Sequence, residues 1–565
     1  MRDAQRLTRS APLLWILALL FTGVWFAMLG ARTLVPTDEG RYAEMAREML
    51  ATGDWITTRL NGIKYFEKPP LQIWMTALAF KLFGLGEWQA RLWTGLCGFA
   101  GIVLTGLAGR RVFDNSSADT GLAAALVLAS CLFWAAMGHI NTLDMGLAGG
   151  MTLALCGLLI AQSSPDGQGR LRWMLACWAG MALAVLSKGL IGLALPGAVL
   201  IVYTVVARDW SIWKRLHLLP GLLVFAVITV PWFVLVSLRN PEFPHFFFIH
   251  EHFQRFTSKV HHREGPLYYF MPILLGGLLP WLVVFGQSLW EARREAPLPV
   301  TAASTDARGF RPKKLLLVWT LFIFVFFSIS SSKLPSYILP IFPSIALLIA
   351  AYLADAPRRA WWLLGGAGTL IGLSMLAYLP RLPKLAKDAA DLANYQAAAP
   401  WIGAAALALL AGALPVLWWT WKRHADLPRL ATLALAISGF TAVQLLMLGA
   451  EPHGRARSGI ELVPAMNAEL TPLMPLYAVG LYDQTLPFYL RRTMTLVAHA
   501  DELEFGLQQE PDLWLPTREA FVERWRTGPR AMAVTRPEIF EQLQLQGVPM
   551  RVIAHDPRRI VITNR

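Results

Sequence analysis

Two short segments carry the residues best suited to chemistry. Residues 36–44 read Pro-Thr-Asp-Glu-Gly-Arg-Tyr-Ala-Glu, and residues 65–70 read Tyr-Phe-Glu-Lys-Pro-Pro. Both segments lie between an apolar stretch at 11–30 and the next membrane-length stretch. Charge is costly in such a position, so it usually marks a substrate or ion site. The pattern indicates catalysis at a membrane surface.

Two carboxylates are candidates for the catalytic groups. Asp38 closely follows the first apolar stretch, and Asp144 stands at the start of the stretch 142–162. If the end of the first stretch and the start of the stretch 142–162 face the same side of the membrane, the two carboxylates can approach one another from different loops. Each could instead cap a helix, where an acidic side chain near the N-terminus is favourable.

Several cations could bind a phosphate group beside these carboxylates. Arginine forks and lysine point charges are the usual phosphate partners in proteins. Lys68 and Lys333 each stand near a proline, which stiffens the backbone that presents them. For Arg59 the simpler interpretation is a side chain that reaches toward lipid headgroups. The cations on the expected external side include Arg41, Arg59, Lys68, Arg255, Arg263 and Lys333.

A run of histidines at 245–262 raises the question of a metal site. His250-Glu251-His252 lacks the helical His-Glu-x-x-His spacing that places two imidazoles on one face. We therefore expect this loop to contact lipid headgroups, and we expect no structural metal. The sequence leaves a divalent cation open as a cofactor.

Composition identifies a membrane protein. Hydrophobic residues form 55% of the 565 positions and charged residues 16%, with a mean hydropathy of +0.45. The basic residues concentrate in short loops between apolar runs, which indicates membrane topology and argues against a nucleic-acid partner. The cysteines lie inside apolar stretches, so no disulfide framework is expected: Cys97, Cys131, Cys156 and Cys177.

The apolar stretches predict about 13 transmembrane helices, at 11–30, 88–108, 119–137, 142–162, 171–186, 188–207, 218–238, 267–289, 314–331, 336–354, 360–379, 400–421 and 430–449. The stretch 71–85 is too short to span and carries Lys81, so we interpret it as a re-entrant or surface-lying helix. Residues 11–30 are interpreted as a retained first helix. With 13 spans and a cytoplasmic N-terminus, basic clusters such as Arg110-Arg111 and Arg358-Arg359 lie on the cytoplasmic side. The opposite, periplasmic side receives the loops 31–87, 138–141, 239–266, 332–335 and 380–399, and everything after residue 450.

The predicted domains are a transmembrane part at 1–450 and a soluble part at 451–565. In the second part the apolar runs 476–479, 493–497, 531–534 and 551–554 alternate with helical patterns at 518–525 and 537–545. This alternation predicts a small periplasmic α/β domain. Because a fold does not by itself give a function, we expect a structural or docking role for it.

Taken together, the motifs resemble those of a known family. Asp38–Tyr42, Tyr65–Pro70, Glu251–Phe256 and Ser331–Pro340 are similar, in order and spacing, to motifs of the bacterial aminoarabinose transferases that modify lipid A. That family belongs to the GT-C clan of membrane glycosyltransferases, which use polyprenyl-phosphate sugars and include protein O-mannosyltransferases. The resemblance covers most of the membrane part.

The resemblance implies an inverting transfer of 4-amino-4-deoxy-L-arabinose from undecaprenyl phosphate to a lipid A phosphate. The enzyme would be a monomer in the bacterial inner membrane, with its site facing the periplasm and in contact with membrane lipids. Its product would confer resistance to cationic peptides such as polymyxin. By motif position, Asp38 and Asp144 would be catalytic, and Glu67, Arg59 and Arg263 would contact sugar or acceptor. The donor phosphate would be bound by Arg41, Tyr65, Lys68, Arg255, Lys333 and Tyr337.

Two other functions stay open. A related transferase could use the same kind of donor but act on protein Ser/Thr or another lipid. A transporter is the weaker alternative, because it would place ionisable residues in broken helices at mid-membrane and show repeated halves. In this chain the charges gather in external loops.

Overall fold

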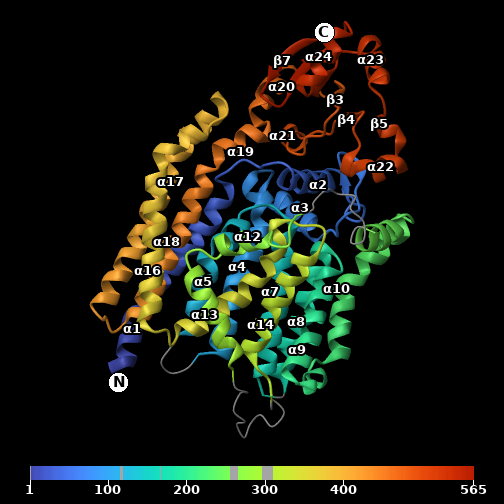
Figure 1. Cartoon of the computed structure of the whole chain (residues 1–565). Coiled ribbons are helices and arrows are strands. Elements are labelled where there is room, and N and C mark those ends of the chain that lie inside the picture. Colours follow the sequence, from blue (N-terminus) through green and yellow to red (C-terminus); the bar gives the residue numbers. More distant parts are fainter. Residues whose placement is uncertain (1, 115–118, 166, 255–264, 296–308) are drawn as a thin grey trace.

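The chain forms a helical bundle with a mixed α/β domain at one end (Figure 1). The computed structural model describes residues 2–114, 119–165, 167–254, 265–295 and 309–565. The N-terminus lies at the end of the bundle far from the C-terminal domain (Figure 1). Helices suit such apolar segments because each backbone polar group is satisfied within its own segment.

The first 450 residues are helical almost throughout. The helices are α1 (Arg2–Ala27), α2 (Asp38–Thr52), α3 (Leu71–Phe83), α4 (Glu87–Val112), α5 (Thr120–Ser130), α6 (Leu132–Met137), α7 (Leu143–Ser163), α8 (Gln168–Lys188), α9 (Ile191–Ala207), α10 (Leu218–Arg239), α12 (Phe270–Gly277), α13 (Leu282–Arg293), α14 (Pro312–Ile329), α15 (Phe342–Leu353), α16 (Arg358–Tyr378), α17 (Ala389–Trp421) and α18 (Leu427–Gly449). A π-helix, η3 (His245–Gln254), and a 3-10 helix, η4 (Pro335–Ile341), complete the part near the site.

The multispanning fold is confirmed, whereas the number of spans stays a prediction. Within the described ranges, nine helices are long and apolar enough to cross a membrane, or ten if α12 and α13, bent by 104°, form one span. The three other predicted spans coincide with α5 and α6, with α8, and with α9. Helix α3 has 13 residues, which agrees with its interpretation as too short to span.

Close contact between α7 and α8 brings the start of one helix next to the end of the other. A Cβ atom at Gly150 would lie 2.8 Å from the backbone of Gly180 and Ala184, so the two helices approach nearly backbone to backbone. Helix α7 begins with Leu143 and α8 ends with Lys188. Because the two helices run in opposite directions, the start of α7 and the end of α8 meet at the same face of the bundle.

A buried ion pair fixes the start of α2. Arg91 of α4 contacts both carboxylate oxygens of Glu39, at 2.6 and 2.8 Å, and both side chains are at most 1% exposed. Arg91 also donates to the carbonyl oxygens of Leu29, Arg32 and Thr33. A buried charge pair is tolerated only where its remaining polar atoms are also satisfied, as they are here. The segment after α1 is thereby held against α4.

The C-terminal region contains a six-stranded sheet, which confirms the predicted α/β fold. The strand order is β5-β4-β3-β6-β8-β7, with β3, β4, β5 and β6 parallel and β8 antiparallel to both β6 and β7. The four predicted runs became β3 (Leu476–Val479), β4 (Thr495–Val497), β6 (Met532–Thr535) and β7 (Arg551–His555). Two strands were not predicted, β5 (Trp514–Leu515) and β8 (Ile560–Thr563). The flanking helices include α19 (Glu451–Ser458), α20 (Val463–Glu469), α21 (Leu486–Leu490), α22 (Glu504–Gln509), α23 (Arg518–Thr527) and α24 (Pro537–Leu545).

The C-terminal region packs directly on the loop between α1 and α4. The buried side chain of Asn61 donates to the carbonyl oxygen of Met494 and accepts from its N–H, at 2.7 and 2.8 Å. At Gly40 a Cβ atom would lie 2.6 Å from the carbonyl oxygen of Gln484, so only glycine fits this contact without displacement. Helices α2 and α3 therefore lie between the bundle and the C-terminal region (Figure 1).

Candidate active site

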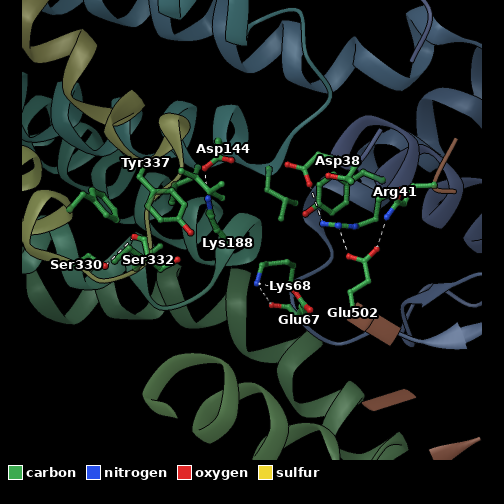
Figure 2. Close-up of a pocket in the computed structure, with 18 of the residues that line it drawn as sticks. Asp38, Arg41, Glu67, Lys68, Asp144, Lys188, Ser330, Ser332, Tyr337 and Glu502 are labelled. Atoms are coloured by element: carbon green, nitrogen blue, oxygen red, sulfur yellow. Dashed lines mark hydrogen bonds and ion pairs between the residues drawn. The ribbon is translucent and has the colours of Figure 1, made fainter. Parts of the chain in front are cut away.

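A cavity of about 620 Å³ opens where the first loop, the bundle and the C-terminal region meet. Its wall combines charged side chains with apolar ones from α7, α9 and α14. Figure 2 shows how the charged groups lie around it. The lining residues are Thr37, Asp38, Arg41, Tyr42, Glu67, Lys68, Leu143, Asp144, Leu147, Lys188, Ile191, Phe326, Phe327, Ser330, Ser331, Ser332, Leu334, Tyr337, Gln484, Asp501, Glu502 and Glu504.

The first charged group joins Asp144 to Lys188. The Lys188 Nζ contacts Asp144 Oδ1 in a short ion pair, and Asp144 is only 5% exposed. The same ammonium lies 4.5 Å from the centre of the Tyr337 ring, close enough for a cation–π contact. Figure 2 shows these three side chains together on one side of the cavity.

Lys188 lines the cavity but was not among the site residues predicted from the sequence. The predicted spans 171–186 and 188–207 left a single residue, Ser187, as the external connection, and so short a link was not counted as a loop. The charge of Lys188 could have indicated a site, because this lysine stands between two apolar runs on the expected external side.

The second charged group places Arg41 between two carboxylates. Arg41 Nη1 lies 3.0 Å from Asp38 Oδ1, and its Nη2 forms a second ion pair with Glu502 Oε2. The Asp38 side chain is 39% exposed, while that of Arg41 is 10% exposed. Burial raises the pKa of the Glu502 carboxyl above its ordinary value, and Arg41 opposes that effect. Asp38 thus keeps a carboxylate surface open to the cavity.

The third charged group is the pair Glu67 and Lys68. The Lys68 Nζ donates to the Glu67 carbonyl oxygen at 2.9 Å and lies 3.7 Å from its carboxylate. Pro69 and Pro70 follow and lead directly into α3. In Figure 2 this pair lies between the Asp144 group and the Asp38 group. The three cations of the lining therefore surround one space.

Some predicted site residues lie outside the lining. Arg59 pairs with Glu510 at 2.9 Å, which explains its position without a ligand. Lys333 is 5% exposed and donates to the Ser328 carbonyl oxygen at 2.6 Å, and burial lowers its pKa. Tyr65 is 2% exposed, and its hydroxyl has no hydrogen-bond partner in the described part of the chain. Arg255 and Arg263 fall outside the described residues.

Six of the predicted site residues lie in the lining of the cavity. Asp38, Arg41, Glu67, Lys68, Asp144 and Tyr337 come together from elements far apart in the sequence. The C-terminal region adds Gln484, Asp501, Glu502 and Glu504, none of which the sequence motifs had indicated. Among the described residues, no three His, Cys, Asp or Glu side chains are arranged to hold a metal ion.

This arrangement suits an anionic headgroup that carries an apolar chain. Lys68, Arg41 and Lys188 offer donors to a phosphate, and Phe326 and Phe327 extend the wall toward apolar surface. A carboxylate that is open to the same space can interact with positive charge as it develops on a substrate.

Two family models match the chain. The model described as "Aminoarabinose transferase C-terminal domain" matches residues 462–564. The model described as "Dolichyl-phosphate-mannose-protein mannosyltransferase" matches residues 67–234, a stretch that includes Lys68, Asp144 and Lys188.

Curated relatives and solved structures agree with these matches. An undecaprenyl phosphate-alpha-4-amino-4-deoxy-L-arabinose arabinosyl transferase from Edwardsiella ictaluri is 31% identical over 366 residues, which is 64% of this chain and 63% of that relative. The alignment thus spans less than two thirds of the curated protein. The crystal structure of ArnT from Cupriavidus metallidurans bound to undecaprenyl phosphate is 43% identical, covers 98% of both chains and has a TM-score of 0.90. The apo structure of the same protein superposes with a TM-score of 0.88 over 98% of this chain and 99% of the other.

Proposed function

We infer the function of this chain from its family: the chain belongs to the ArnT family of aminoarabinose transferases. We propose that it moves 4-amino-4-deoxy-L-arabinose from undecaprenyl phosphate to a phosphate of lipid A. The observation that carries the proposal is the cavity itself, in which cations and an open carboxylate meet beside apolar side chains. A relative that aligns over 98% of the chain was crystallised with undecaprenyl phosphate, which supports the choice of donor.

In the proposed reaction the donor breaks at the bond between the anomeric carbon and the phosphate oxygen. The electron pair of that bond goes to the phosphate oxygen of the donor. An oxygen of the acceptor phosphate forms the new bond to the anomeric carbon from the opposite face of the sugar. Negative charge therefore grows on the leaving phosphate. Lys68 and Arg41 are placed to stabilise it, because preorganised cations stabilise charge that develops in the transition state.

Asp38 has a different task in this scheme. A phosphate acceptor is already largely ionised near neutral pH and needs no strong general base. Asp38 lines the cavity with a side chain that is 39% exposed, and it can orient the acceptor or stabilise the positive charge that develops on the sugar ring. Asp144 holds Lys188 beside Tyr337 and so completes the opposite wall. Direct attack by the acceptor, without a covalent enzyme intermediate, inverts the anomeric centre.

We place the reaction on the periplasmic face of the inner membrane, with lipid A as acceptor. Adding an amino sugar to a lipid A phosphate reduces its negative charge and would weaken the binding of cationic peptides such as polymyxin. A second candidate function is transfer to protein Ser/Thr, which the match of residues 67–234 to a protein mannosyltransferase model favours.

Mass spectrometry of lipid A tests the proposal in cells. Cells that express the chain should carry a pentosamine on a lipid A phosphate, and cells without it should not. Asp38→Asn is the matched control, since it keeps the shape and removes the charge. Unmodified lipid A in expressing cells, with a pentose or hexose found on protein instead, would favour the second candidate.

A further inference from the structure

The Arg41 guanidinium is shared between two parts of the chain. An arginine fork commonly binds one carboxylate with both of its terminal nitrogens. Here Nη1 contacts Asp38 of the first loop at 3.0 Å, while Nη2 contacts Glu502 of the C-terminal region. The fork is therefore split, and Asp38 receives only one of its two arms (Figure 2).

Glu502 is itself held in place. Its Oε1 accepts a hydrogen bond from Gln484 Nε2 at 3.0 Å, and its Oε2 contacts Arg41. Gln484 stands in a turn fixed by Asp483, whose Oδ1 accepts from the N–H and the hydroxyl of Thr485. The Glu502 side chain is 15% exposed, so its position follows from these contacts rather than from solvent.

The split fork leaves binding capacity unused at the cavity. Arg41 Nε is buried and has no hydrogen-bond partner among the residues that the structure describes. The Asp38 side chain is 39% exposed although it touches an arginine. If Glu502 lost its charge, Arg41 Nη2 could turn toward Asp38, so that both arms of the fork bind the two oxygens of that carboxylate. That closure would occupy the carboxylate that the reaction needs.

We propose that Glu502 is a positioning residue, which holds one arm of Arg41 so that Asp38 keeps an oxygen available to the substrate. This inference rests on the proposed function, because it assigns Asp38 to the transfer reaction. It also gives the C-terminal region a direct part in the active site. The same region would then be required for turnover and not only for docking.

The test compares turnover with donor-lipid binding in the purified full-length chain. Glu502→Gln should lower kcat about tenfold or more, because the fork closes on Asp38. Binding of undecaprenyl phosphate should stay within about twofold of the parent or become tighter, since the change removes a negative charge beside the lipid phosphate. Glu502→Asp keeps the charge on a shorter side chain and should recover part of kcat.

Glu510→Gln is the matched control. It makes the same change at a carboxylate that joins the C-terminal region to Arg59 outside the cavity lining, so kcat should stay near the parent value. Parental kcat in Glu502→Gln would overturn the inference. Loss of kcat with an equal loss of lipid binding or of thermal stability would also overturn it, because that pattern indicates a structural role. If the parent itself transfers no sugar, the proposed function fails instead.

Discussion

At the scale of single residues, the cavity assigns different work to its two carboxylates. Asp38 is open to the cavity and held on one side only, whereas Asp144 is buried and paired with Lys188. Such unequal environments are how proteins give similar groups different roles. The sequence motifs predicted that both carboxylates are catalytic but did not distinguish their roles. The exposure of each depends on a residue of another segment, Lys188 for Asp144 and Glu502 for Asp38.

Asp38→Asn tests the role of the open carboxylate. The transfer rate should fall roughly a hundredfold or more, as is typical when a group acts in the transition state. Binding of undecaprenyl phosphate and expression should stay near the parent level. Asp512→Asn, at an exposed aspartate of the C-terminal region, serves as the control. A parental rate in Asp38→Asn would reduce Asp38 to a residue at the start of α2 with no catalytic part.

Lys68→Ala tests the binding of the donor phosphate. Loss of a charge-assisted contact should weaken undecaprenyl phosphate binding by on the order of tenfold and slow transfer as well. Lys68→Arg should recover only part of both, because the two cations present different donor geometries. Lys64→Ala is the control, since Lys64 pairs with Glu242 at 2.7 Å outside the cavity lining. Unchanged binding in Lys68→Ala would move the phosphate site elsewhere, with Arg255 and Arg263 as the next candidates.

At the scale of elements, most of the local structure could be predicted, and the contacts between elements could not. Apolar length predicts the helices, and alternating apolar runs predicted four of the six strands of the large sheet. Lys333 shows the limit: beside Pro335 it had the features of a preorganised phosphate ligand, but the chain turns it onto the Ser328 carbonyl oxygen. Glu502 shows the converse, because nothing in its local sequence indicates that it meets Arg41.

Gly40→Ala tests the contact between α2 and the C-terminal region. The added Cβ would lie 2.6 Å from the Gln484 carbonyl oxygen, so the turn that holds Glu502 must move. Overpacking of this kind typically costs about 1–3 kcal/mol. We expect faster hydrogen exchange around residues 483–486 and a lower transfer rate. Gly366→Ala, in α16 with no atom within 4 Å of its added Cβ, should leave both unchanged. Parental exchange rates in Gly40→Ala would show that the contact can relax without moving the turn.

At the scale of the whole molecule, the site forms only because the loop between α1 and α4 meets both the bundle and the C-terminal region. Residues of the first loop, of α7 and α8, and of the C-terminal region share one cavity. The predicted boundary at residue 450 falls between α18 and α19, which follow one another almost without a break. The division into two domains therefore stays a proposal, and the C-terminal wall of the cavity argues for treating the chain as one catalytic unit.

Cysteine labelling tests the proposed topology. The four native cysteines are buried, so single introduced cysteines can be read against them. Leu473→Cys, at a side chain 94% exposed in the C-terminal region, should react with a membrane-impermeant thiol reagent added outside the inner membrane. Trp210→Cys, at a position 68% exposed and predicted to face the cytoplasm, should react only after permeabilisation. The reverse pattern would place the cavity on the cytoplasmic side.

Transfer by the reconstituted protein distinguishes a lipid A acceptor from a protein acceptor. The purified full-length chain would be placed in lipid vesicles with undecaprenyl-phosphate-linked 4-amino-4-deoxy-L-arabinose and an equal mixture of lipid A and a Ser/Thr-containing peptide. Mass spectrometry of both acceptors would then follow the sugar, with the Asp38→Asn protein run in parallel. We expect one pentosamine added to a phosphate of lipid A, an unmodified peptide, and little product with Asp38→Asn. Sugar on the peptide alone, or equal product from the parent and Asp38→Asn, would contradict it.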